Sequence, residues 1–180
     1  MLSTSKVLFL AFFDICRLIK RPQDIAESKN LLTLCVIVYG FLSILLASLS
    51  YPTDKAMLAG VVEVSLIMLF SLALLQICGK SSRWTQTVTA LVGTNIIISV
   101  IAFPIYILIG VGELSEHESS TGQSIGLLLL ASLACWNIVI MAHILRHALE
   151  TNFVLAIFLA ITYIWIIFSF TSVIMPMETN

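Results

Sequence analysis

The sequence predicts an all-α polytopic membrane protein with five transmembrane helices, preceded by a cytoplasmic amphipathic interfacial helix. Of its 180 residues, 59% are hydrophobic and only 11% are charged, which gives a mean hydropathy of +1.07. Soluble domains are about half apolar and about a quarter charged, and a small globule cannot cover this much apolar surface in water. The charges also stand in short segments between long uncharged stretches. The sequence therefore predicts that the apolar stretches lie in a lipid bilayer.

Residues 1–29 form the predicted lead-in, with a helix over residues 4–21 that Pro22 ends. On a helical wheel, Arg17, Lys20 and Arg21 fall on one narrow strip, and most other positions are apolar. Such a helix lies parallel to the membrane, with its basic residues at the lipid headgroups. A helix docked on the base of the bundle is an alternative that is compatible with this position.

The bundle is predicted over residues 30–176, and a short extracytoplasmic tail, 177–180, follows it. A helix needs about 20 apolar residues to cross the hydrocarbon core, and backbone groups in lipid must bond within their own helix. Short loops make consecutive helices antiparallel neighbours. The five spans are expected near residues 31–50, 57–78, 86–111, 123–145 and 152–175.

Positive charge predicts the orientation of the chain in the membrane. In a five-span arrangement, all but one of the 9 Lys and Arg residues lie on one side, and Lys55 lies opposite. By the positive-inside rule, the N-terminus is cytoplasmic and the C-terminus is extracytoplasmic. The side opposite to the basic residues carries Asp54, Glu113, Glu116, Glu118 and Glu178.

Glu63 is the acidic residue well inside a predicted span, about six residues or roughly 9 Å from the outer end. An ionised carboxylate near the bilayer centre costs on the order of 2.5–3.5 kcal/mol. Its side chain is therefore expected to face the bundle or a water-filled cavity, at the depth of Ser43 and Tyr106. Two interpretations stay open: a proton or cation site, and a protonated carboxyl that is hydrogen-bonded within the bundle.

Two asparagines and a row of small residues predict contacts between helices. Asn95 and Asn137 lie near the middle of adjacent spans, where amide hydrogen bonds between helices stabilise a bundle. Gly122 and Gly126 form a small-xxx-small pair that continues to Ala131, a pattern typical of close helix packing.

Motifs for catalysis, metals and nucleic acids are missing from the sequence. No hydrolase, kinase, P-loop or zincin pattern occurs, so we expect no enzymatic activity and no cofactor. The net charge of −1 and the short basic Lys20-Arg21 block exclude an electrostatic nucleic-acid partner. We expect no metal site either, because no His stands at ligand spacing from the four cysteines, Cys16, Cys35, Cys78 and Cys135.

Three local segments carry a resemblance to a known family. These are the basic stretch with proline at 15–22, the segment 79–87 that leads to a span with Pro104, and the helix end 143–150 after Trp136. With five spans and short loops, the chain resembles the Yip family, the Ypt-interacting five-span membrane proteins, in its short bacterial form. The resemblance implies a bacterial inner membrane and, as in eukaryotic members, an adaptor role in membrane traffic.

The sequence leaves three hypotheses of function open. The first is a non-enzymatic membrane scaffold or accessory subunit of a larger membrane assembly, which acts by helix packing with a membrane-protein partner or as a homo-oligomer. The second is a small proton- or cation-coupled transporter or channel that uses Glu63. The third is the trafficking adaptor that the family resemblance implies.

Overall fold

The computed structural model describes residues 2–113 and 121–174, and every regular element in these ranges is helical. Five of the helices, α2 to α6, are long and apolar enough to cross a membrane, and the shorter apolar α1 precedes them. The predicted fold class is therefore confirmed. The predicted tail 177–180 and the acidic Glu116, Glu118 and Glu178 lie outside the described residues. The helices are α1 (Leu2–Cys16), α2 (Lys29–Ala47), α3 (Thr53–Ile77), α4 (Trp84–Glu113), α5 (Thr121–Leu149) and α6 (Phe153–Ile174), with two short 3-10 turns, η1 (Pro22–Asp24) and η2 (Ser81–Arg83).

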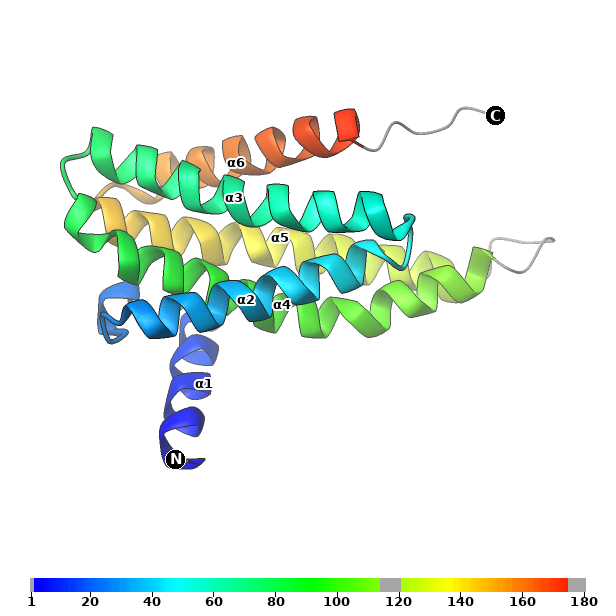
Figure 1. Ribbon diagram of the computed structural model, residues 1–180, viewed down its shortest axis with the longest axis horizontal. Coiled ribbons are helices and arrows are strands. Elements are labelled where there is room, and N and C mark those ends of the chain that lie inside the picture. Colours follow the sequence, from blue (N-terminus) through cyan, green and yellow to red (C-terminus); the bar gives the residue numbers. More distant parts are fainter. Residues whose placement is uncertain (1, 114–120, 175–180) are drawn as a thin grey trace.

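The five long helices run alternately in opposite directions and close a ring in the order α2, α3, α6, α5, α4 (Figure 1). Consecutive helices pair in three cases, but α4 packs mainly on α2 and α5 instead of α3. The buried residues of α2, which include Leu32, Cys35 and Tyr39, point into the bundle. Helix α2 therefore contacts both α3 and α4 and lies between them in the ring.

The centre of the fold is the first half of α4, where residues 87–94 are buried around the whole helix. Burial on every side makes this stretch part of the core of the bundle. Its threonines satisfy their hydroxyls within α4, because Thr87, Thr89 and Thr94 donate to the carbonyls of Arg83, Thr85 and Ala90 at 2.9, 2.7 and 2.9 Å. These polar side chains therefore need no partner on another helix.

The predicted helix over residues 4–21 is wrong at its C-terminal end, because α1 ends at Cys16. Leu18 has a φ of 62°, and its N–H bonds to the Ile15 carbonyl at 2.8 Å while the Ile19 N–H bonds to the Asp14 carbonyl at 2.9 Å. This pair of bonds is a Schellman cap with leucine at the left-handed position that glycine usually takes. The three basic residues Arg17, Lys20 and Arg21 therefore follow the helix and do not form a strip along it.

Helix α1 lies across the long direction of the bundle and packs on α4 and α5 (Figure 1). Phe12, Ile15 and Cys16 are buried at this contact. Gly93 of α4 permits it, because a Cβ there would come within 2.3 Å of the Phe12 ring. The outer side of α1 exposes apolar residues that include Phe9, so one face of α1 docks on the bundle and the other suits lipid.

Candidate functional site

Glu63 of α3 is half-buried and faces its neighbour α2. One carboxyl oxygen accepts a hydrogen bond from the Tyr39 hydroxyl and the other accepts one from the Ser43 hydroxyl. Tyr39 and Ser43 are four residues apart, so they share one face of α2. The two helices approach closely at Gly60, where a Cβ would lie 2.5 Å from Ile44 Cγ1. Glycine at this position lets the α2 hydroxyls reach the carboxyl.

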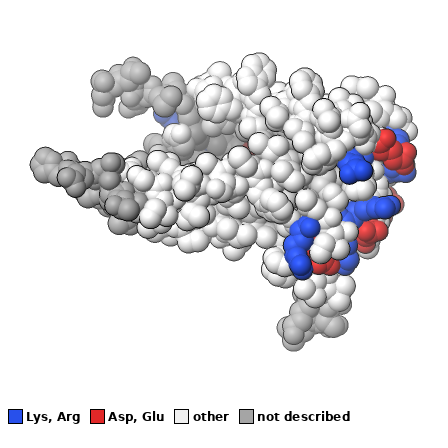
Figure 2. All heavy atoms as spheres, turned by 180° about the vertical axis from the view of Figure 1, so that it is seen from behind, with Lys and Arg blue, Asp and Glu red and all other residues white. Residues whose placement is uncertain are grey.

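A cavity of about 360 Å³ opens from Glu63 between α2, α3, α4 and α6. It reaches Ser50 and Tyr51 in the connection between α2 and α3, where both residues are exposed. Figure 2 shows the Lys, Arg, Asp and Glu side chains gathered mainly at one end of the bundle and a hollow at the other. The polar side chains that line the cavity are Ser43, Ser50, Tyr51, Glu63, Ser99, Tyr106 and Thr171.

A second polar layer lies one helical turn deeper than this lining. Tyr39 precedes Ser43 by four residues, Asn95 precedes Ser99 by four, and Tyr163 precedes the lining residue Ile167 by four. Tyr39 and Tyr163 are only 3% and 5% exposed, and Asn95 is half-buried.

Two further contacts complete this layer. The Tyr163 ring packs on Phe70 at a centroid distance of 5.2 Å. The buried Tyr163 hydroxyl has no hydrogen-bond partner among the described residues. This layer therefore holds two hydroxyls and one amide, one helical turn deeper than the cavity lining.

The donor set of the cavity suits a proton or a hard cation. It offers one carboxyl and several hydroxyl oxygens, the ligand type that hard cations prefer. Among the described residues, no Lys or Arg lines it. Across the described part of the chain, no group of three or more His, Cys, Asp or Glu side chains could hold a metal ion. A single monovalent charge balances the one carboxylate.

The other predicted contact residues have different positions. Asn137 is half-buried on α5 and forms no hydrogen bond within the described residues, so it does not join Asn95. Gly126 lies against α4, where its Cβ would meet Ile109 Cγ1 at 2.8 Å, and the half-buried Gly122 precedes it by one turn. Ala131 is exposed, because a step of five residues turns about 140° around a helix.

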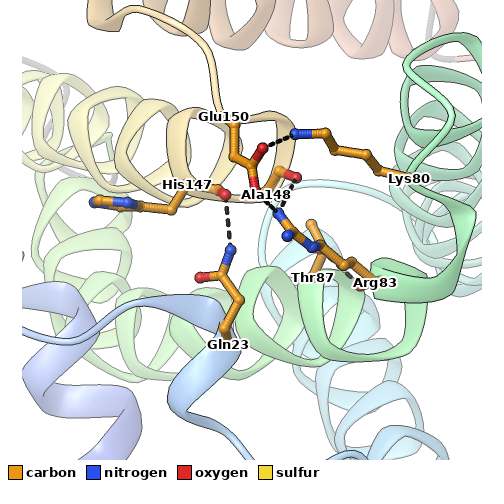
Figure 3. Close-up of polar contacts among 7 residues, drawn as sticks. All are labelled: Gln23, Lys80, Arg83, Thr87, His147, Ala148 and Glu150. Carbon is orange, nitrogen blue, oxygen red and sulfur yellow. Dashed lines mark hydrogen bonds and ion pairs between the residues drawn. The ribbon is translucent and has the colours of Figure 1, made fainter.

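The charged end of the bundle ties the lead-in to α4 and α5 (Figure 3). Gln23 donates to the His147 carbonyl at 2.7 Å. Arg83 lies 2.7 Å from Glu150, which also pairs with Lys80. Hydrogen bonds from Lys80 and Arg83 hold the pKa of the exposed Glu150 carboxyl below its ordinary value.

The predicted interfacial basic residues all lie near this end. Lys20 pairs with Asp14 at 3.2 Å, and its carbonyl accepts from His143 at 3.0 Å. Arg17 and Arg21 are exposed. Only Arg21 of the three lines the pocket formed with α4 and α5.

Comparison with protein-family models, with curated proteins and with solved structures finds no match to this chain. The resemblance to the Yip family therefore stays a hypothesis that rests on the three local segments.

Sequence reasoning placed one of the two hydrogen-bond partners of Glu63 at its depth, Ser43, and missed the other, Tyr39. Ser43 and Tyr106 were expected at its depth, and both line the cavity. Tyr39 and Tyr163 were not expected. A signal existed for Tyr39, because a tyrosine and a serine four residues apart on an otherwise apolar span place two hydroxyls on one face.

Proposed function

We propose that this protein is a small proton- or cation-coupled membrane transporter or channel that takes up its ion at Glu63. The observation that carries this proposal is the position of the carboxyl. It lines a polar cavity inside an apolar bundle and accepts hydrogen bonds from Tyr39 and Ser43. Ionisable groups at this depth are costly and are typical of ion or proton pathways.

The cavity is one-sided, which favours a gated pathway over an open pore. Its lining extends from Glu63 to the connection between α2 and α3, and the buried Tyr39 and Tyr163 lie one helical turn deeper. An ion that enters from this side meets Glu63 before these two tyrosines. Release to the other side requires Tyr39 or Tyr163 to move.

The test is ion flux into vesicles that contain the purified chain. We expect the wild type to dissipate a proton or Na⁺ gradient and Glu63→Gln to abolish this flux while the protein stays folded. Glu27→Gln is the matched control, because it makes the same chemical change on an exposed residue. Flux that is equal in wild type and Glu63→Gln would refute the proposal.

A scaffold or accessory subunit is the second candidate, and one observation favours it. Ala131 and Cys135 are exposed on one face of α5, and Trp136 beside them is also exposed. Small residues on an outer face let a second helix approach closely. Oxidative cross-linking through Cys135 in native membranes should trap a partner or a second copy if this face is an interface.

The orientation remains a proposal as well. The charged end holds Arg21, Lys80 and Arg146, and the positive-inside rule assigns it to the cytoplasm. Reporter fusions at Asp54, Lys80 and Arg146 should read outside, inside and inside. A cytoplasmic position for Asp54 would reverse the side from which the cavity is reached.

A further inference from the structure

A second pocket, of about 430 Å³, lies at the charged end of the bundle. It is formed by the segment after α1, the turn η2 before α4 and the end of α5. Its volume falls in the range of small-ligand sites, about 300–1,000 Å³. Figure 3 shows Gln23, Arg83 and Glu150 converging on this region from three separate segments. The lining residues are Arg21, Gln23, Asp24, Arg83, Arg146, His147, Glu150 and Thr151.

The charge of this pocket is positive, because three guanidinium groups face two carboxylates. Both carboxylates already have partners. Glu150 pairs with Lys80 and Arg83, and Asp24 accepts the backbone N–H of Arg21 at 2.9 Å. Neither of the two remaining guanidinium groups, those of Arg21 and Arg146, forms an ion pair with a described carboxylate. The described lining therefore carries one net positive charge, and Arg21 and Arg146 are two cations in it without a carboxylate partner among the described residues.

Its walls are held by contacts between distant parts of the chain. The bond from Gln23 to the His147 carbonyl joins residues 124 positions apart. Glu150 has a φ of 52°, and the Thr151 N–H bonds to the Arg146 carbonyl at 3.1 Å. This cap ends α5 and fixes the positions of Arg146, in its last turn, and of Glu150, just after it. A left-handed glutamate is strained backbone, which persists only where the surrounding contacts hold it.

We propose that this pocket binds the phosphate group of an anionic ligand between Arg21 and Arg146, with Arg83 beside it. Guanidinium groups match phosphate oxygens with paired hydrogen bonds. The pocket lies where the apolar spans end, at the level at which basic pockets meet lipid headgroups. A phospholipid headgroup and a soluble phosphate share this chemistry, so the test must separate them.

The experiment uses the full chain purified in neutral detergent or in phosphatidylcholine nanodiscs. One probe is phosphatidylglycerol added as a fraction of the lipid, with the lipid retained per chain measured by native mass spectrometry. The other probe is inorganic phosphate, with binding measured by titration calorimetry. The test variant is Arg21→Gln with Arg146→Gln. The matched control is Arg17→Gln with Lys29→Gln, which removes two exposed basic residues outside the pocket.

We expect saturable binding of one probe that is weakened about tenfold or more in the test variant and is unchanged in the control. Binding of phosphatidylglycerol alone identifies a lipid site, and binding of inorganic phosphate identifies a site for a soluble ligand. Equal loss in both double variants would show diffuse surface attraction and overturn the proposal. Absence of saturable binding of either probe would also overturn it. Size-exclusion profiles that match the wild type exclude misfolding as the cause of any loss.

Discussion

Two carboxyl groups, that of Glu63 inside the bundle and that of Glu150 at its charged end, have opposite kinds of partner. Glu150 is exposed and pairs with two cations, Lys80 and Arg83. Glu63 is half-buried and is held by two neutral hydroxyls, those of Tyr39 and Ser43.

The difference follows from the solvent around each group. At the membrane surface, water hydrates the cations, and an ion pair adds little because it is screened. Inside the bundle, a partner cation would need desolvation of its own, whereas a hydroxyl satisfies the carboxyl without adding charge. Under the proposed function, these neutral partners leave the carboxyl of Glu63 without a competing cation among the described residues.

The largest effect should come from Glu63→Ala. This change leaves the Tyr39 and Ser43 hydroxyls without their acceptor in a half-buried site, at a cost of about 1–3 kcal/mol for each unsatisfied group. We expect a clearly lower midpoint in denaturant unfolding in detergent. Glu63→Gln keeps an acceptor and should lie close to the wild type. If both variants unfold at the wild-type midpoint, the hydroxyl contacts do not stabilise the bundle.

Gly60→Ala should give the next largest effect, about 1–3 kcal/mol of destabilisation through overpacking. The new Cβ would lie 2.5 Å from Ile44 Cγ1 and force α3 away from α2. Gly40→Ala is the matched control on the same pair of helices, because its Cβ would meet Val64 at an ordinary 3.6 Å. Alanine should stabilise the helix there, by roughly 0.5–1 kcal/mol. Thermal unfolding measures both changes in stability. A shift of the unfolding temperature in the same direction for the two variants would contradict this packing.

A smaller effect should appear in the pH dependence of the charged end. The pKa of Glu150 is lowered from 4.5 by Lys80 and Arg83, so its contribution to stability is present above pH 4.5 and is lost as the pH falls below it. The wild type should therefore be more stable to unfolding than Glu150→Gln at neutral pH. This difference in stability should shrink on acidification, and also in high salt. A constant difference between the two proteins from pH 3 to pH 7 would show that the ion pairs do not stabilise the fold.

The smallest effect should separate two replacements of Glu150 itself. Both Glu150→Gly and Glu150→Ala remove the ion pairs, but only glycine adopts a φ of 52° without strain. We expect the glycine variant to unfold at the higher temperature. The reverse order would mean that the left-handed cap does not limit stability.

The sequence predicts the spans better than it predicts their ends and partners. Long apolar stretches are sufficient to identify α2 to α6, because hydrocarbon thickness sets the length of a span. The end of α1 was missed because Leu18 takes a left-handed position that carries no sequence signal, whereas Gly79, with a φ of 67°, marks the end of α3 in the expected way. The neighbours of Glu63 depend on the order of the helices in the ring. That order could not be predicted from the sequence, because the apolar surfaces of the five helices are nearly identical.

The proposed entry of a cation from the end with the α2–α3 connection is tested most directly by thiol labelling at Ala59, which lines the cavity. The variant Ala59→Cys is made with Cys78→Ser and Cys135→Ser. Cys16 and Cys35 stay in place because they are buried, and burial raises the pKa of the Cys16 thiol to about 11, which keeps it unreactive.

Membrane-impermeant reagents of either charge are then added to each side of sealed vesicles. We expect labelling only from the side of the α2–α3 connection, faster with the cationic reagent than with the anionic one, and loss of that preference when Glu63→Gln is added. No labelling from that side, or equal rates for both reagents with Glu63 present, would contradict a cation-binding cavity.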